Sequence, residues 1–318
     1  MTRAASIDIG TNSIRLLVAE IDGTGNLKKI MTRRKITRLG EDFVRTGRIS
    51  PKAMGRSAKV LEEYANLLKE YNIRTTVAVA TSIVREAANR DEFLQQVYQG
   101  TGLEVMVISG DEEARITLIG VLSIVDDLVD RAIVVDIGGG STEFIVVQGK
   151  VPLATYSTEL GSVYLTERFI QCDPPSPAEV GKLEVFINNR LSSMLRHSFE
   201  AQTGNSFSFL VGTAGTITTL AAMDQKMNVY DQGRINRYIL TRESVKIIYK
   251  SLQRIPVPER YVLPGLEKGR EDIILAGTAV VVKIMEVLGF HEMIVSDYGL
   301  LEGIVLSCFS PWRESAYS

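Results

Sequence analysis

The chain has 318 residues, of which 45% are hydrophobic and 23% charged, so it can bury substantial cores and its length favours two domains. A net charge of −2 argues against a general binder of nucleic acid or membrane surfaces, because such proteins need a broadly basic face. Two histidines and two widely separated cysteines argue against a histidine-rich metal centre, a disulfide framework and Ser-His-Asp chemistry, and the cytosol is the expected compartment.

The first predicted element is a strand, a turn and a second strand in "IDIGTNSIRLLV", residues 7–18. The chain repeats this pattern in "VDIGGGSTEFIV", residues 135–146. In the superposed copies Asp8 matches Asp136, Gly10 matches Gly138 and Ser13 matches Ser141. The repeat predicts two related halves.

The repeated turn has a chemical rationale besides that of a tight hairpin. Glycines let backbone N–H groups approach phosphate oxygens, while a nearby carboxylate and hydroxyls can organise hydrated Mg²⁺. Two matching copies favour phosphate binding. The copies differ where Arg15 in the first is replaced by Glu143 in the second. An anion beside a phosphate loop favours hydrolysis, in which it orients water or a metal, although an outward strand residue is the simpler alternative.

A basic segment follows the first copy, at residues 28–48. It contains eight Lys or Arg residues against Glu41 and Asp42, a net charge of +6. Such a concentration of charge in an acidic protein is a candidate surface for a multiply charged phosphate. A solvated edge strand protected by lysine and arginine is the alternative.

The next predicted elements are a helix over residues 52–71 and strands over residues 75–80 and 103–108, each strand followed by a helix. Thr81 or Ser82 would cap the first of these helices and place Arg85 in its first turn, where a cation is unfavourable unless it faces an anion. A surface arginine is the alternative.

The stretch "ISGDEEARI", residues 108–116, ends the second of these strands. Ser109 and Glu112 fit a capping box, which leaves Glu113, about 100° further round the helix, as the candidate general base for activating water. A solvated first-turn acid is an equally good interpretation of Glu113.

After the second copy, the sequence predicts a strand over 151–158 and a helix over 177–196. The run 209–223, "FLVGTAGTITTLAAM", predicts a strand, a glycine-hydroxyl turn and a helix. The longest uncharged run, residues 201–223, is long enough for a membrane span, but its glycines, serines and threonines favour strand, loop and helix. Gly212, Thr213, Gly215 and Thr216 could cradle phosphate or ribose, or could allow close packing of the helix.

Together with "ATSIVREAAN", "REDIILAG" and "VSDYGLLEGI", these motifs resemble the exopolyphosphatase / guanosine pentaphosphate phosphohydrolase family from Ile7 to about Ile304. The resemblance implies an α/β chain of two ribonuclease-H-like domains of the actin-like ATPase superfamily, each with a mixed five-stranded sheet flanked by helices, and substrate in the cleft between them. The expected domains are residues 1–124 and 125–318, with a final helix at about 300–318 as a candidate to pack back on the first domain.

The activity implied by the resemblance is Mg²⁺-dependent hydrolysis of the terminal phosphoanhydride of inorganic polyphosphate, with a monovalent cation as an optional addition. Glu113 and Glu143 are the implied catalytic acids, and Asp8, Asp136 and Glu143 the metal ligands. The resemblance and the glycine loops together give these phosphate contacts: Gly10, Asn12, Ser13, Arg15, Arg85, Gly138, Gly139, Gly140, Ser141, Thr142, Gly212 and Thr213.

Two departures from the family pattern and three rival functions accompany this prediction. A C-terminal helical region with a His-Asp pair is expected to be missing after Ser318, and Gln232-Gly233 stands where many members have histidine and glycine.

The rival functions are hydrolysis of guanosine pentaphosphate (pppGpp), phosphoryl transfer by a small-molecule kinase, and a catalytically silent phosphate or nucleotide sensor. The expected partners are polyphosphate or pppGpp, with no nucleic acid or membrane and with a homodimer left open.

Overall fold

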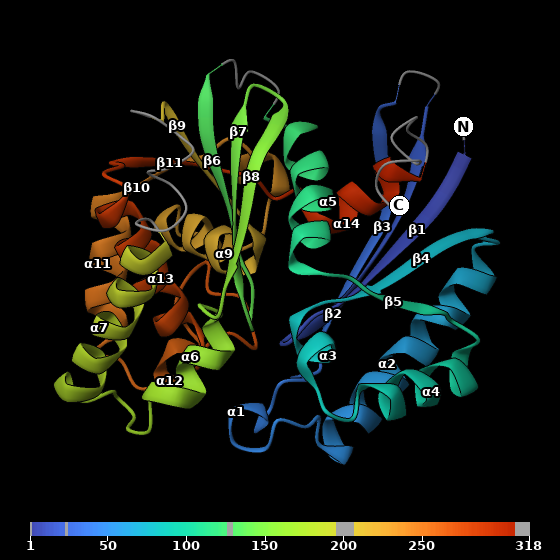
Figure 1. Cartoon of the computed structure of the whole chain (residues 1–318), viewed down its shortest axis with the longest axis horizontal. Coiled ribbons are helices and arrows are strands. Elements are labelled where there is room, and N and C mark those ends of the chain that lie inside the picture. Colours follow the sequence, from blue (N-terminus) through green and yellow to red (C-terminus); the bar gives the residue numbers. More distant parts are fainter. Residues whose placement is uncertain (1, 23–24, 126–129, 195–206, 309–318) are drawn as a thin grey trace. The chain divides into compact units, whose positions relative to one another are not determined.

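The computed structural model describes residues 2–22, 25–125, 130–194 and 207–308. The chain forms two compact units (Figure 1). Unit 1 contains Met1–Ser123 and Tyr298–Ser318, and unit 2 contains Ile124–Asp297. The chain therefore leaves unit 1 once, completes unit 2 and returns, and each unit is described by itself below.

Unit 1 is built on a mixed sheet of five strands in the order β3-β2-β1-β4-β5. Strands β1, β2 and β3 form an antiparallel meander, whereas β4 and β5 continue the sheet parallel to β1. Alternating apolar residues and the glycine turn make the β1–β2 hairpin, as the sequence predicted. The bounds are β1 Thr2–Ile9, β2 Ser13–Ile21, β3 Leu27–Ile36, β4 Thr75–Ala80 and β5 Val105–Val107.

Helices cover both faces of this sheet. The predicted helix over 52–71 is α2, whose N-cap Ser50 accepts a hydrogen bond from Ala53 N–H, and it packs with α4 on one face. Helix α14 packs on the other face, where the Ser6 hydroxyl donates to the carbonyl of Leu301 at 2.8 Å. The bounds are α1 Phe43–Thr46, α2 Pro51–Glu70, α3 Ser82–Glu86, α4 Arg90–Thr101, α5 Gly110–Leu122 and α14 Leu300–Ser307.

Helices α5 and α14 lie side by side (Figure 1) and approach at backbone distance. A Cβ atom at Gly303 would lie 1.9 Å from the carbonyl oxygen of Ile116, and one at Gly120 would lie 2.0 Å from that of Gly299. Only glycine fits at these two positions, so the C-terminal helix is an integral part of unit 1. Residues 309–318 of the predicted final helix lie outside the described residues.

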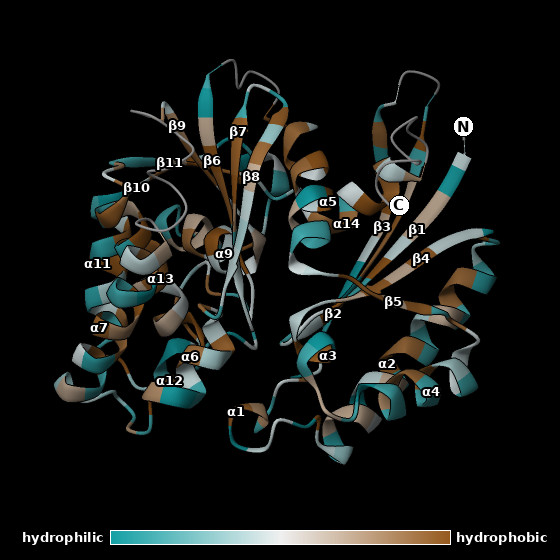
Figure 2. Cartoon of the chain, viewed as in Figure 1, coloured by the Kyte–Doolittle hydropathy of each residue, from teal (hydrophilic) through white to brown (hydrophobic). Residues whose placement is uncertain are grey.

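Unit 2 repeats the topology, with strands in the order β10-β11-β9-β6-β7-β8. The sixth strand, β10, is a three-residue addition at the edge beside β11, beyond the five that were expected. Strands β6 and β7 are buried along almost their whole length, which explains their continuous β-branched runs; β7 is largely brown in Figure 2. The bounds are β6 Arg131–Ile137, β7 Thr142–Gln148, β8 Val151–Thr158, β9 Phe209–Thr213, β10 Ile239–Thr241 and β11 Glu292–Val295.

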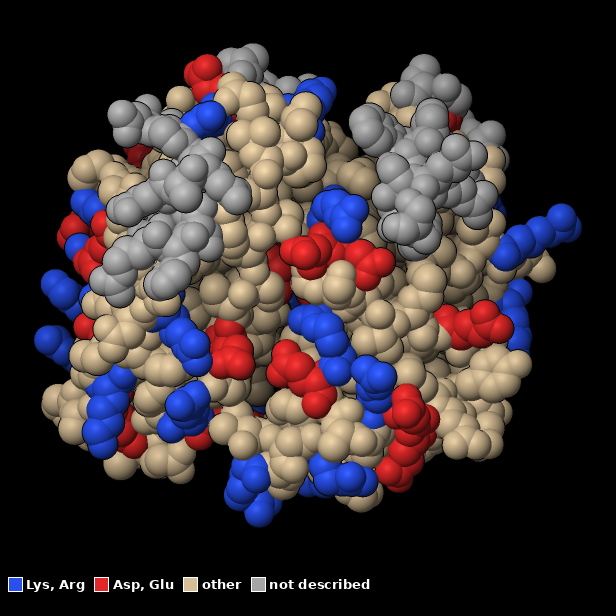
Figure 3. Space-filling view, in the orientation of Figure 1, with Lys and Arg blue, Asp and Glu red and all other residues tan. Residues whose placement is uncertain are grey.

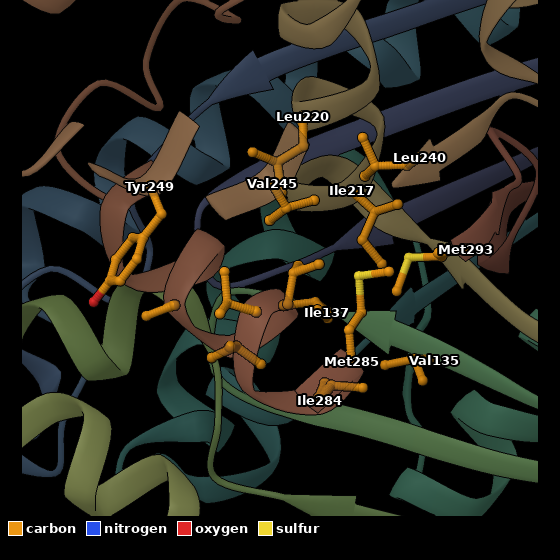
Figure 4. Close-up of a cluster of buried hydrophobic side chains, with 14 of the residues drawn as sticks. Val135, Ile137, Ile217, Leu220, Leu240, Val245, Tyr249, Ile284, Met285 and Met293 are labelled. Carbon is orange, nitrogen blue, oxygen red and sulfur yellow. The ribbon is translucent and has the colours of Figure 1, made fainter. Parts of the chain in front are cut away.

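The core of unit 2 is a cluster of apolar side chains from the sheet and its helices (Figure 4). At its centre lies α13, which is buried for most of its length and carries its one charged pair, Lys283 and Glu286, near its C-terminal end. The predicted helix over 177–196 is α7, and the last two predicted residues lie outside the described part. The bounds are α6 Ser162–Phe169, α7 Pro177–Met194, α9 Ala214–Asp224, α10 Gln232–Ile235, α11 Arg242–Leu252, α12 Val257–Arg260 and α13 Ile274–Val287.

Candidate active site

The predicted site residues of unit 1 gather at the carboxyl edge of its sheet. Parallel strands β1, β4 and β5 end at the same edge, where loops and helix starts from distant parts of the chain meet. The Thr11 hydroxyl lies 3.3 Å from that of Ser82, which ties the turn after β1 to the start of α3. The glycine turn, Arg85 and Glu113 therefore share one edge of one sheet.

The carboxylate of Asp8 in this unit is held by Arg15. The two residues are directly opposite each other on β1 and β2. Arg15 donates to Asp8 Oδ2 from Nε at 2.9 Å and from Nη2 at 2.6 Å. Because one oxygen of this buried carboxylate already accepts two charge-assisted hydrogen bonds, Asp8 fits a structural role in aiming Arg15 better than a role as a metal ligand.

The turn between β1 and β2 contains an unsatisfied donor. Gly10 N–H donates to the carbonyl of Ser13 at 3.1 Å, which closes the turn. The side chain of Asn12 is 7% exposed, and its Nδ2 has no hydrogen-bond partner in the part of the chain that the structure describes. Leaving a buried donor unpaired costs about 1–3 kcal/mol, so Asn12 is well suited to receive an oxygen of a bound anion.

Glu113 and Arg85 are brought together from two helices. The predicted capping box is present, with Ser109 and Glu112 bonding to each other's backbone N–H groups. Glu113 is only 8% exposed, so the solvated first-turn interpretation does not hold. Arg85 Nη1 lies 3.4 Å from Glu113 Oε2 and donates to the carbonyl of Ile108 at 2.8 Å. The guanidinium thus compensates for the charge of the buried acid.

In unit 2, the row equivalent to Asp8 and Arg15 consists of two acids. Asp136 on β6 and Glu143 on β7 are directly opposite each other, and both are buried. Glu143 is 1% exposed, which excludes the outward orientation that was the alternative. The hydroxyl of Ser157 on β8 donates to Glu143 Oε1 at 2.9 Å.

The turn of three glycines after β6 is fixed by the start of α6. Gly138 N–H donates to the Ser141 carbonyl at 3.0 Å, as in the first copy. The carbonyl of Gly139 accepts from the N–H groups of Val163 and Tyr164. Because N–H and C=O point in opposite directions in a trans peptide, the N–H of Gly140 points away from α6, as an anion-binding amide should.

Two residues predicted as phosphate contacts also have packing roles. Thr142 is fully buried, and its hydroxyl donates to the carbonyl of Leu160 at 2.8 Å. This hydrogen bond holds the turn in place. A Cβ at Gly212 would lie 2.4 Å from Met293 Sδ, which makes this glycine a requirement of close packing. Thr213, at the end of β9, lies opposite Asp136 and belongs to the acidic row.

Arg270 is a candidate residue that the sequence prediction did not include. A Cβ at Gly215 would lie 1.6 Å from Arg270 Nη2, so the guanidinium covers the first turn of α9. Arg270 is 8% exposed, and its Nε donates to Glu267 Oε2 at 2.9 Å. A cation at a helix N-terminus is unfavourable unless an anion lies beside it, and the carboxylate of Glu267 supplies one here. The argument that singled out Arg85 applies here, but only the fold places Arg270 at α9.

The loop that carries Arg270 is held by hydrogen bonds from a second buried arginine, Arg260. Arg260 donates to the carbonyls of Ile255, Leu252 and Glu271 at 2.7–2.9 Å. The Glu271 carboxylate in turn accepts from the N–H of Gly269. The residues on either side of Arg270 are therefore fixed.

At the Gln232-Gly233 departure, the Gln232 side-chain amide donates to the carboxylate of Asp297, which also accepts from Tyr230. Gln232 is the first residue of α10. The amide therefore fastens this short helix to the residue at which unit 2 ends.

The residues of unit 2 provide two carboxylates for a magnesium ion but not a complete set of protein ligands. Among the described residues, no group of three or more His, Cys, Asp or Glu side chains could hold a metal by itself. Mg²⁺ is commonly bound through one or two carboxylates, with water and substrate phosphates completing its shell. Asp136 and Glu143 supply that donor set, whereas Asp8 is engaged with Arg15.

On the face that Figure 3 shows, Lys and Arg side chains are interspersed with Asp and Glu side chains. None of the helices in the described ranges is both long enough and apolar enough to cross a bilayer.

Comparisons with known proteins identify the family. The model of the Ppx/GppA phosphatase family matches residues 17–310. The chain is 34% identical to exopolyphosphatase 2 of Mycobacterium tuberculosis, over 96% of this chain and 98% of the relative. A crystal structure of the Aquifex aeolicus member of the Ppx/GppA family matches with a TM-score of 0.81 and 34% identity, covering 100% of this chain and 99% of that one.

A second solved structure, an exopolyphosphatase from Cytophaga hutchinsonii, matches with a TM-score of 0.87 and 26% identity, covering 96% of this chain and 97% of that one. These matches span nearly whole chains on both sides, so they concern the entire fold and not one domain. The chain belongs to the Ppx/GppA phosphatase family and is a phosphoanhydride hydrolase.

Proposed function

We propose that this hydrolase releases orthophosphate from the end of inorganic polyphosphate, with Mg²⁺ as its cofactor. The observation that carries the proposal is Glu113, a buried carboxylate aligned by Arg85 at the sheet edge that also holds the unsatisfied amide of Asn12. Glu113 would take a proton from the attacking water, and the turn amides and Arg15 would bind the phosphoryl oxygens.

In this proposal Asp136 and Glu143 would hold the magnesium ion, and Ser157 would fix the orientation of Glu143. The ion would supply charge neutralisation for the phosphoryl oxygens. Positioning and electrostatics would thus account for most of the catalysis, as is general in phosphoryl transfer.

The decisive variant is Glu113→Gln, which keeps the shape of the side chain and removes its basicity. We expect turnover to fall by about 10²- to 10⁴-fold while polyphosphate still binds. Glu112→Gln is the matched control, because Glu112 neighbours Glu113 but belongs to the capping box. Near-normal turnover of Glu113→Gln would refute its assignment as the base.

The same phosphate-release assay separates the substrates. Polyphosphates of graded length and pppGpp should each be tested with and without Mg²⁺. We expect the highest kcat/KM with polyphosphate. A clear preference for pppGpp would replace the proposed substrate, transfer of phosphate only to an acceptor would indicate a kinase, and binding without any release would indicate a sensor.

A further inference from the structure

The basic segment provides one arginine to the same row as Asp8 and Arg15. Strand β3 is the edge strand of unit 1, and its register places Arg34 directly opposite Arg15 on β2. The row that crosses β1, β2 and β3 is therefore Asp8, Arg15 and Arg34. It carries two guanidinium groups and one carboxylate, which leaves a net charge of +1.

The neighbours of Arg34 in sequence belong to the opposite face of the sheet. Arg33 pairs with Leu16, which packs in the apolar cluster under α2, and Lys35 lies 3.8 Å from Glu63 of that helix. Arg34 shares its face with Leu17, which packs under α14. Strand alternation thus separates Arg34 from Arg33 and Lys35, whereas Lys29 of the basic segment shares its face and pairs with Glu302 of α14.

Two arginines directly opposite each other on adjacent strands destabilise a sheet. Asp8 binds Arg15 and offsets this repulsion. An anion that contacts both guanidinium groups would add to that compensation. The unsatisfied Nδ2 of Asn12 lies at the same end of the sheet, because the Asn12 carbonyl accepts from the N–H groups of Thr37 and Arg38, just after β3.

We propose that Arg34 binds a phosphate of the substrate chain other than the one that is released, and that Arg15, between Asp8 and Arg34, contacts both phosphates. The strand order supports this separation, since Arg34 lies on β3, whereas Glu113 and Arg85 follow β5 and β4 at the other side of β1. Adjacent strands are about 4.8 Å apart, so β3 lies about 10 Å from β1. The inference rests on the proposed function, because it takes polyphosphate as the substrate.

The test compares Arg34→Met with Arg33→Met, which removes the same charge one residue away on the opposite face. Both proteins would be assayed for equilibrium binding of polyphosphate without Mg²⁺ and for hydrolysis with it. We expect Arg34→Met to weaken binding and raise KM by about tenfold with kcat within about twofold, and Arg33→Met to stay within about twofold in both. Arg34→Lys should recover part of the lost affinity, and melting temperatures establish that each variant folds.

The result that would overturn the inference is an equal effect of the two methionine variants, which would reduce Arg34 to one charge among many. A weakening of product inhibition by orthophosphate that matches the weakening of polyphosphate binding would also overturn it, because Arg34 would then belong to the released phosphate. If the parent protein binds polyphosphate through Arg34 but releases no phosphate, the proposed function fails and the inference stands. If the parent protein hydrolyses polyphosphate and Arg34→Met changes neither binding nor KM, the proposed function stands and the inference about Arg34 fails.

Discussion

The two units place the same backbone turn beside rows of opposite charge. In unit 1 the row is Asp8, Arg15 and Arg34, and in unit 2 the matching positions are Asp136, Glu143 and Ser157. Both turns close with the same hydrogen bond between a glycine N–H and a serine carbonyl. The fold thus supplies backbone amides twice, while residues on the returning strands decide whether a row attracts an anion or a cation.

The strongest way to break this comparison is to give unit 2 the charge of unit 1. Glu143→Arg should lower Mg²⁺-dependent phosphate release by at least about 10³-fold, because it reverses a buried charge that the proposal assigns to the metal. Glu143→Gln tests the same point without burying a cation. Ser157→Ala removes only the hydroxyl that orients Glu143 and should cost about tenfold. More than a tenth of parental activity in Glu143→Arg would contradict the metal assignment.

A smaller effect distinguishes the two equivalent aspartates. Asp136→Asn should raise the Mg²⁺ concentration for half-maximal activity by about tenfold or more. Asp8→Asn should leave that concentration within about twofold and instead raise KM for polyphosphate by about tenfold, because Arg15 loses its charged partner. Titration of activity with Mg²⁺ at saturating substrate checks both. Equal shifts in the two variants would make Asp8 a metal ligand as well.

The smallest expected effect concerns the helix caps of the two units. Glu179 in unit 2 closes a box with Ser176 like that of Ser109 and Glu112 in unit 1. Hydrogen bonds from the backbone of Ser176 first, and then from that of Gln171, lower the pKa of Glu179 from 4.5 to about 2.

A depressed pKa adds stability that is present above the unfolded value and is lost as the pH falls through the folded one. Glu179→Gln should therefore lower the melting temperature slightly near neutral pH, and the difference should shrink below pH 4.5 towards about 2. Thermal melts of both proteins between about pH 7 and about pH 3 check this. A difference that stays constant across that range would show that the carboxylate charge does not contribute.

The sequence predicted the features that depend on local chemistry. The two hairpins follow from alternating residues around acid-glycine turns, and the Ser109 cap follows from a four-residue pattern. The choice of Glu113 over a solvated acid could not be made locally, since its burial depends on α3 and β5 arriving beside α5. The role of the Thr142 hydroxyl could not be predicted locally either, because its acceptor, the carbonyl of Leu160, belongs to another segment.

Features that depend on distant segments were missed or left open. Arg270 reaches Gly215 from a loop far along the chain, and nothing in the residues around either glycine or arginine indicates that meeting. Arg34 could be seen only as part of a basic segment, because its face depends on the β2–β3 register, which shifts at Val18. The three-residue strand β10 is too short to leave a periodic pattern.

The return of α14 to unit 1 has a consequence for biosynthesis. The apolar side chains that α14 covers belong to β1, β2 and α5, which a ribosome makes long before Leu301 and Val305. A nascent chain that has been synthesised only as far as Ser123 therefore exposes an apolar surface, and this surface stays exposed until the whole of unit 2 has been synthesised. Unit 1 is thus the first unit to be started by the ribosome and the last to be completed.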